Sequence, residues 1–367
     1  MHEIAELSKG IGISKGQLSE NGTPCILYGE LYTKYKSEII SKIISKTDIE
    51  KSKLKHSKQN DVIIPCSGET AIDIAVARCV PFDNVLLGGD MNVIRLHKYD
   101  GAFMAYQLNG KRKTDIAKLA QGVSVVHLYG ENLKSIKTYN PSLQEQQKIV
   151  KLLSMLDERL EVQNKIIEDL KKLKSAIIDK LYSSTNGEIY SFRQLFEVVN
   201  EKNKARAYKN VLSASQELGM IERSDINIDI KFEQESISGY KIVHKGDYVV
   251  HLRSFQGGFA FSDRTGICSP AYIILRPNDL VVYGYLSHFF TSKPFIKSLK
   301  LVTYGIRDGR SINVDEWLDM PILLPPAQEQ IRILTIVNAI DAKLHNEVKV
   351  QFCLSSQKSY LLNTMFI

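Results

Sequence analysis

Apolar residues recur at heptad spacing in two long stretches of the chain. In the first stretch, steps of four, three and four residues separate Ile149, Leu153, Leu156 and Leu160, and the pattern continues at Ile167, Leu170, Ile177 and Leu181. The second stretch has the same steps at Ile333, Val337, Ile340 and Leu344, and continues through Leu354, Leu361 and Met365. This spacing is typical of a helix that packs along one seam against another helix. We predict two long helices, within residues 141–187 and 325–367.

The two stretches are copies of one another. Residues 141–160 and 325–344, aligned at an offset of 184, are identical at seven of 20 positions, including Gln146 and Gln330. Polar residues interrupt both seams at equivalent places, where Gln163 matches Glu347 and Lys174 matches Lys358. Polar seam residues usually set the register and the partner of a helix pair. Two unrelated amphipathic helices are the alternative, and they do not explain the shared register. We therefore expect the helices to pair with each other or with a partner, in the simplest case antiparallel, through Gln146, Ile149, Leu153, Leu156, Leu160, Gln330, Ile333, Val337, Ile340 and Leu344.

The remaining sequence predicts two domains of mixed α/β type, residues 1–140 and 188–324. Short apolar runs bounded by turn formers predict strands at Asp61–Cys66, Ile72–Val80 and Met91–Leu96, and at Asp247–Leu252, Gly258–Ser262 and Ala271–Leu275. Asn60-Asp61-Val62-Ile63 aligns with Gly246-Asp247-Tyr248-Val249 at an offset of 186, which indicates that the domains are also repeats. The predicted fold class is α+β. Two domains would be separated by two long antiparallel coiled-coil helices, with pseudo-twofold symmetry.

Composition and charge allow several classes of function and exclude few. With 367 residues, 44% of them hydrophobic, the chain is long enough for two domains with sizeable cores. Its net charge of +7 permits a polyanionic partner without requiring one. The sequence has no apolar run of the ~20 residues that a membrane span needs, and no signal-peptide pattern at its start. The five cysteines form no Cys-x-x-Cys pair, which favours a reducing compartment. We expect a cytoplasmic protein.

The sequence contains no recognisable catalytic motif. It lacks the phosphate-binding loop of nucleotide hydrolases, the glycine-rich dinucleotide fingerprint and the Asn/Asp-Pro-Pro-aromatic signature of base methylation. The eight histidines show none of the spacings typical of zinc sites. The pattern predicts a chain without enzyme activity and without a metal or cofactor of its own.

Basic and aromatic residues in turns of both domains are typical of DNA contacts. Arginine and glutamine can pair with base edges, whereas lysines suit phosphates. Candidate DNA contacts in the first domain are Lys34, Tyr35, Lys36, Ser67, Thr70, Lys111, Arg112 and Lys113. Those in the second domain are Arg253, Phe255, Gln256, Tyr304, Arg307 and Arg310. Each loop alone fits an ordinary solvated surface, and only their occurrence in both repeats favours DNA.

The repeated helix motif resembles a known family. Pro-x-x-Gln-Glu-Gln…Ile…[Leu/Ile]-Asp-x-[Arg/Lys]-Leu, within 141–160 and 325–344, is similar to the conserved helical regions of type I restriction–modification specificity subunits. The stretch Cys268-Ser269-Pro270-Ala271-Tyr272 and the later Arg307-Asp308-Gly309-Arg310 look like that family's target recognition domains, so Ser269 and Tyr272 join the candidate DNA contacts.

The resemblance implies a function and a set of partners. Each domain would read one half of a two-part site in double-stranded DNA, and the helices would act as a ruler. Two methyltransferase subunits would dock on the helices, and restriction subunits would join the larger complex. Catalysis, S-adenosylmethionine, ATP and Mg²⁺ would belong to these partners.

One feature departs from the family pattern. Ile4-Ala5-Glu6-Leu7 matches Leu195-Phe196-Glu197-Val198, so we expect the first domain to begin several residues short of the second.

Two other classes of function stay open. One alternative is a coiled-coil scaffold that holds two protein-binding domains. The other is a nuclease with an unrecognised active site in the divergent domains.

Overall fold

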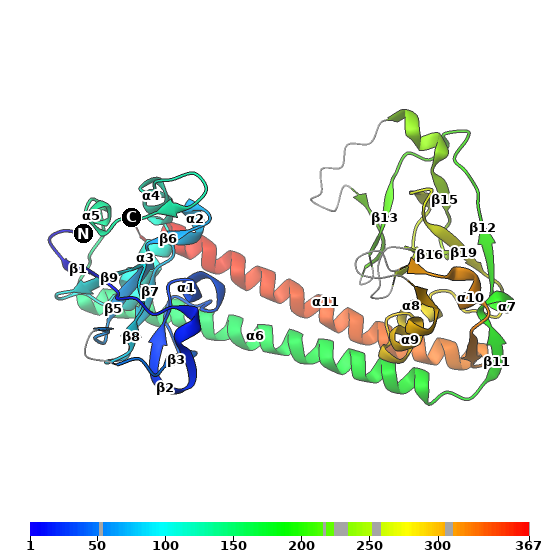
Figure 1. The fold of residues 1–367 in the computed structure, drawn as a ribbon, viewed down its shortest axis with the longest axis horizontal. Helices are drawn as coiled ribbons and strands as arrows, with labels where there is room; N and C mark the ends of the chain where they lie inside the picture. The colour runs from blue at the N-terminus through cyan, green and yellow to red at the C-terminus, as the bar shows by residue number, and fades with distance from the viewer. Residues whose placement is uncertain (51–53, 216–217, 224–233, 252–257, 305–310, 367) are drawn as a thin grey trace. The chain divides into compact units, whose positions relative to one another are not determined.

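The computed structural model describes residues 1–50, 54–215, 218–223, 234–251, 258–304 and 311–366 (Figure 1). The chain divides into two compact units. Unit 1 consists of Met1–Lys165 and Val348–Ile367, and unit 2 consists of Ile166–Glu347. Each unit contains a β-rich domain and part of each of two long helices, α6 and α11.

The domain of unit 1 is built on an antiparallel four-stranded sheet. Its strands lie in the order β1 (Ala5–Lys9), β9 (Met91–Leu96), β5 (Asp61–Pro65) and β7 (Arg78–Val80). A second sheet has the order β3 (Ser45–Thr47), β2 (Leu18–Ile26), β8 (Leu86–Leu87) and β4 (Lys55–His56), and β6 (Ser67–Gly68) pairs with β10 (Val126–His127). The short helices are α1 (Glu30–Thr33), α2 (Ala71–Ile74), α3 (Gly101–Asn109), α4 (Lys113–Lys118) and α5 (Gly130–Leu133).

The domain of unit 2 has an antiparallel four-stranded sheet of the same order. Its strands are β12 (Phe196–Val199), β19 (Ile273–Pro277), β16 (Tyr248–Val250) and β17 (Phe259–Phe261). Four strand pairs accompany it: β11 (Glu188–Ser191) with β22 (Pro321–Leu324), β13 (Leu212–Ser215) with β14 (Gly219–Glu222), β15 (Lys241–Val243) with β18 (Gly266–Cys268), and β20 (Thr303–Tyr304) with β21 (Ser311–Ile312). Its short helices are α7 (Phe192–Leu195), α8 (Tyr285–Phe289), α9 (Lys293–Ser298) and α10 (Val314–Leu318).

The same local structure opens the central strand of both sheets. Asp61 begins β5 and accepts two hydrogen bonds from the Arg95 guanidinium, at 2.8 and 2.7 Å, and one from the Lys58 amide at 2.8 Å. The equivalent Asp247 accepts bonds from Arg276, at 3.0 and 3.1 Å, and one from the His244 amide at 2.8 Å. Bidentate arginine–carboxylate pairs fix two groups in one geometry. The sequence match between the domains therefore marks a turn, a strand start and an interstrand ion pair that both domains use.

One predicted strand is partly wrong. Ile72–Val80 was expected to be extended, but its first part lies in helix α2, and only Arg78–Val80 forms a strand. The Thr70 hydroxyl accepts a hydrogen bond from the Asp73 amide at 3.2 Å, which caps the start of α2. A capping residue satisfies a backbone donor that the first helical turn leaves free, so the local chemistry favours the helix over an apolar strand.

The cores of the two units differ in composition. In unit 1, helix α3 is buried along most of its length, with Phe103 and Tyr106 inaccessible to solvent. In unit 2, aromatic rings surround Trp317, the only tryptophan of the chain, and the Phe192 ring stacks on it at 4.3 Å between centroids. Fluorescence of Trp317 therefore reports the state of unit 2.

The two long helices are α6 (Leu143–Ser183, 41 residues) and α11 (Ala327–Thr364, 38 residues). Ser142 and Glu145 form a capping box at the start of α6, with the Ser142 hydroxyl 2.8 Å from the Glu145 carboxylate. Within unit 1, Asp157 contacts Lys358 and Asn164 contacts Gln351, so the segments of α6 and α11 in this unit run antiparallel. Among the described residues, no helix is long and apolar enough to cross a membrane.

Candidate nucleic-acid and partner interface

The repeated glutamine of the helix motif holds the start of each long helix to its own domain. Gln146 of α6 is fully buried; its side-chain oxygen accepts a bond from the Asp100 amide at 2.9 Å, and its nitrogen donates to the Pro141 carbonyl at 2.8 Å. Gln330 of α11 accepts a bond from the Val282 amide at 2.8 Å and donates to the Leu280 and Pro325 carbonyls, both at 2.9 Å. These side chains, predicted to lie on the helix–helix seam, instead join helix to domain.

Alanine at either glutamine is expected to destabilise the unit that contains it by about 1–3 kcal/mol, because buried backbone groups lose their partners. Gln330→Ala should shift the urea unfolding transition seen by Trp317 fluorescence, since both residues belong to unit 2. Gln146→Ala should leave that transition in place and shift the circular-dichroism signal of unit 1. A Trp317 transition that moves equally in both variants would contradict two separate anchors.

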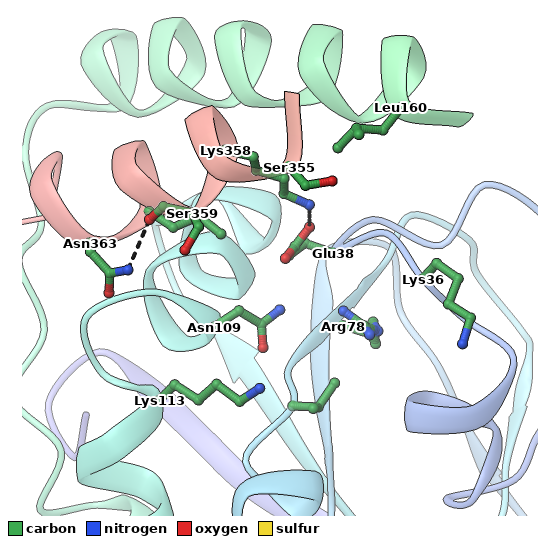
Figure 2. A pocket seen from close by; sticks show the side chains of 12 residues that line it. Lys36, Glu38, Arg78, Asn109, Lys113, Leu160, Ser355, Lys358, Ser359 and Asn363 are labelled. Atoms are coloured by element: carbon green, nitrogen blue, oxygen red, sulfur yellow. Dashed lines mark hydrogen bonds and ion pairs between the residues drawn. The ribbon is translucent and has the colours of Figure 1, made fainter. Parts of the chain in front are cut away.

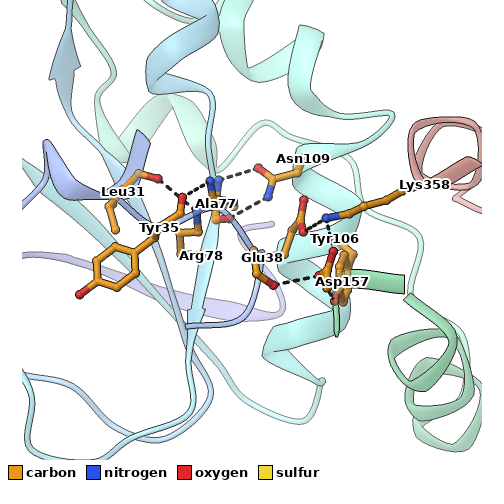
Figure 3. Close-up of polar contacts among 10 residues, drawn as sticks. Leu31, Tyr35, Glu38, Ala77, Arg78, Tyr106, Asn109, Asp157 and Lys358 are labelled. Atoms are coloured by element: carbon orange, nitrogen blue, oxygen red, sulfur yellow. Dashed lines mark hydrogen bonds and ion pairs between the residues drawn. The ribbon is translucent and has the colours of Figure 1, made fainter. Parts of the chain in front are cut away.

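A buried ionic cluster joins three elements within unit 1 (Figure 3). Lys358 of α11 pairs with Glu38 of the domain at 2.5 Å and with Asp157 of α6. Asp157 also accepts bonds from the Tyr106 hydroxyl at 2.7 Å and the Ser37 hydroxyl at 2.9 Å. The side chains of Lys358, Glu38 and Asp157 are 13, 7 and 10% exposed.

Unit 2 contains the equivalent helix–helix pair in a more open setting. Lys174 of α6 pairs with Asp341 of α11 at 2.5 Å, with side chains 25 and 35% exposed. Lys174 and Lys358 are equivalent in the repeat, and so are Asp341 and Asp157. One pair of equivalent seam interruptions, Lys174 and Lys358, therefore supplies the cationic ends of a repeated ion pair, which sets the register of α6 against α11 within each unit.

The apolar seam positions pack against both the domain and the other long helix. In unit 1, Leu153 and Leu156 of α6 lie in one buried cluster with Phe103 and Tyr106 of α3 and with Leu354, Leu362 and Phe366, and Ile149 and Leu160 are half-buried beside it. In unit 2, Ile333 and Val337 of α11 are fully buried in the cluster that contains Ile178 of α6 and Trp317, whereas Ile340 and Leu344 are half-buried.

Comparisons with known proteins match this architecture. The sequence model of the family described as the type I restriction modification DNA specificity domain matches residues 1–172. A Methanocaldococcus jannaschii protein that carries the name of the type I restriction enzyme MjaX specificity subunit is 24% identical over 312 residues, which cover 75% of this chain and 70% of that protein.

Two solved structures share the fold. The crystal structure of the type I restriction-modification system S subunit from M. genitalium covers 100% of this chain and 94% of its own, at 17% identity and a TM-score of 0.56. A structure from work on complex assembly and conformational transition of the type I R-M system covers 98% of this chain and 95% of its own, at 14% identity and a TM-score of 0.61. Residues 1–172 match the specificity-domain family of type I restriction-modification systems, and the chain is similar to a type I specificity subunit over 75% of its length. Subunits of this family are non-catalytic in general.

Three of the predicted DNA contacts serve the internal structure of unit 1. Tyr35 is 6% exposed, its hydroxyl accepts a bond from the Ile44 amide at 3.3 Å, and burial raises its pKa to about 12. Ser67 is buried in strand β6, opposite His127 of β10. Thr70 caps helix α2. These side chains have local partners that the sequence pattern did not reveal.

Other predicted contacts in unit 1 are accessible. Lys36 and Lys113 line one hollow, although they are 77 positions apart in the sequence. Lys34 pairs with Glu30 at 2.7 Å, Arg112 lies 3.7 Å from Asp115, and Lys111 is exposed.

In unit 2, the Tyr304 hydroxyl is exposed and donates to Glu316 at 2.6 Å. Ser269 and Tyr272 are half-buried in one turn, where the Tyr272 amide donates to the Ser269 carbonyl at 3.1 Å. The other five predicted contacts lie outside the residues that the structure describes: Arg253, Phe255, Gln256, Arg307 and Arg310.

Sequence reasoning missed two groups of residues. Arg78 is buried and donates to the carbonyls of Leu31 and Tyr35. Its lone charge in the apolar run from Ala75 to Val80 was the sequence feature that could have revealed it.

An exposed basic–aromatic cluster is the second group that sequence reasoning missed. The Lys9 ammonium lies 5.8 Å from the Tyr129 ring centroid, and the His127 and Tyr129 rings stack at 6.4 Å.

An apolar surface lies beside the buried seam on α6. Leu152, Met155 and Val162 each precede a seam position, and they are 45, 53 and 59% exposed. On α11 in the same unit, Phe352 is 72% exposed. Large apolar side chains in a row on an exposed helix mark an interaction surface more often than ordinary solvated surface.

Proposed function

We propose that this chain is a type I restriction-modification specificity subunit, which reads a two-part target in double-stranded DNA through domains 1–140 and 188–324. The helices within 141–187 and 325–367 act as the spacer that sets the distance between the two half-sites. The observation that carries the proposal is the duplication of one plan: each domain has the same sheet order, its own glutamine anchor and its own helix–helix ion pair. A duplicated recognition module suits a target with two separate halves.

Partner subunits carry out the catalytic chemistry. Two methyltransferase subunits dock on the helices, and the exposed apolar residues of α6, Leu152, Met155 and Val162, suit a helix from such a partner. This chain is itself non-catalytic. S-adenosylmethionine, ATP and Mg²⁺ are bound by the methyltransferase subunits and by the restriction subunits of the full complex.

Positive charge supports DNA binding. The chain carries a net charge of +7, and Lys9, Lys36, Lys111 and Lys113 lie at accessible places in unit 1. Lysines that neutralise phosphates release counterions, so binding should weaken steeply with salt, with a log–log slope near −0.9 for each contact.

Substitution of a base-reading arginine tests the assignment of half-sites. Arg253→Ala or Arg310→Ala, both in the second domain, is expected to cost about 1–3 kcal/mol of binding at one half-site and to leave the preference at the other half-site unchanged. Binding of the chain with its methyltransferase subunits to duplexes mutated in either half measures this. Equal weakening on every duplex would instead show that the arginines contact phosphates.

Purified chain that transfers methyl groups by itself would contradict the non-catalytic role.

A further inference from the structure

A hollow of about 310 Å³ opens in unit 1 between the recognition domain and the last turns of α11 (Figure 2). The domain side supplies Lys36, Glu38, Arg78, Asn109 and Lys113, and α11 supplies Ser355, Lys358, Ser359 and Asn363. In Figure 2 the side chains of Lys113 and Asn109 extend toward Arg78. The lining therefore combines cations with hydroxyl and amide groups.

Hydrogen bonds to the backbone hold the Arg78 side chain in this lining. It is 7% exposed, and its Nε and Nη2 atoms donate to the carbonyls of Leu31 and Tyr35 at 3.1 and 2.9 Å. These neutral acceptors orient the guanidinium without cancelling its charge. Among the described residues, no carboxylate lies within ion-pair distance of Arg78. Burial lowers its pKa, and the charges of Glu38 and Asp157 partly oppose that shift, so a further anion would be favourable here.

The carboxylates near the hollow are already paired. Glu38, the one acidic residue in the lining, contacts Lys358 at 2.5 Å, and Lys358 also pairs with Asp157. This leaves Lys36, Arg78 and Lys113 without an acidic partner in the lining. The hollow therefore has an excess of positive charge on the domain side, and the Ser355 and Ser359 hydroxyls face it from α11. The Asn109 and Asn363 amides are already bonded, to the Ala77 backbone and to the Ser359 carbonyl.

We propose that this hollow binds a phosphate group. An arginine, two lysines and nearby hydroxyls are the groups that bind phosphate oxygens through charge-assisted hydrogen bonds. The group comes either from the DNA backbone or from a small phosphorylated molecule, and both present the same oxygens. Because one side of the hollow is α11, a bound phosphate would also tie the C-terminal helix to the recognition domain. The backbone contact at Gly110, where a Cβ would lie 2.2 Å from the Leu362 carbonyl oxygen, shows how closely the two parts approach beside the hollow.

Phosphate binding by the full chain tests the proposal without depending on sequence-specific DNA reading. Thermal unfolding is followed by circular dichroism in millimolar inorganic phosphate, against chloride of the same ionic strength. Phosphate should raise the melting temperature of the wild-type chain. Lys36→Ala and Lys113→Ala should each weaken phosphate binding by roughly tenfold or more. Lys118→Ala is the matched control, because Lys118 is an exposed residue of α4 that does not line the hollow.

A second arm identifies the source of the phosphate. If DNA supplies it, Lys36→Ala and Lys113→Ala should each reduce the salt slope for a non-specific duplex by about 0.9. If a small phosphorylated molecule supplies it, the slope stays unchanged while the phosphate effect on melting is lost. The proposal is overturned if phosphate stabilises all four proteins equally, or if neither the melting temperature nor the salt slope responds to the two lysines.

Discussion

Lys358→Ala is expected to destabilise unit 1 by about 3–5 kcal/mol, because it leaves two buried carboxylates, Glu38 and Asp157, without their shared cation. Urea unfolding followed by circular dichroism measures the loss. The matched control is Lys174→Ala, which removes the equivalent lysine from the more exposed pair with Asp341. That change should cost about 1 kcal/mol or less.

A compensating variant separates charge burial from simple loss of packing. Replacing Glu38, Asp157 and Lys358 together by apolar residues of similar volume should recover part of the lost stability, because no unpaired charge remains. Recovery is incomplete because the Tyr106 and Ser37 hydroxyls lose the acceptor that Asp157 supplies. Equal losses for Lys358→Ala and Lys174→Ala would contradict the assigned difference in burial. So would a triple variant that is less stable than Lys358→Ala.

Lengthening both helices is expected to widen the gap between the half-sites while leaving their sequences unchanged. Seven residues inserted after Lys165 in α6, and seven after Lys349 in α11, preserve the heptad seam. Both insertions fall between the two helix–helix ion pairs, Asp157–Lys358 and Asp341–Lys174, so both pairs can still form. Each insertion adds about 10.5 Å of helix. At ~3.4 Å per base pair, the unspecified spacer should grow by about three base pairs.

An insertion in α6 alone is the control for this prediction. It shifts one helix past the other, so the two ion pairs cannot both form, and a defined spacer should be lost. Methylation mapping in a host that contains the methyltransferase subunits reads both outcomes. Full activity of the double insertion with an unchanged spacer, or with altered half-site bases, would rule out the ruler.

The sequence predicted the features that depend on periodicity and repetition. Heptad spacing around Leu153 and Val337 indicated two long helices, and the Asp61 and Asp247 segments indicated related domains with mixed helix and strand. The apolar pattern of Ile72–Val80, in contrast, predicted a strand along its whole length. Its first part is a helix, because the Thr70 side chain caps the helix start.

Partners remote in the sequence could not be predicted. Gln146 and Gln330 stood out as repeated, but their bonds to the Asp100 and Val282 amides depend on how each domain folds back onto its helix. Tyr35 lies between two lysines, as an exposed aromatic DNA contact would, and only its burial in the folded domain shows that it belongs to the core. The hollow shared by Lys36, Arg78 and Lys113 likewise exists only once three separate segments come together.

The most direct test is a map of methylated bases in a host that expresses this chain with its methyltransferase subunits, compared with a host that lacks this chain alone. The account predicts methylation at one two-part target, with two short defined halves separated by an unspecified spacer of fixed length, and none of it without the chain. A single continuous target, a spacer of variable length, or methylation at the same sites without this chain would contradict it.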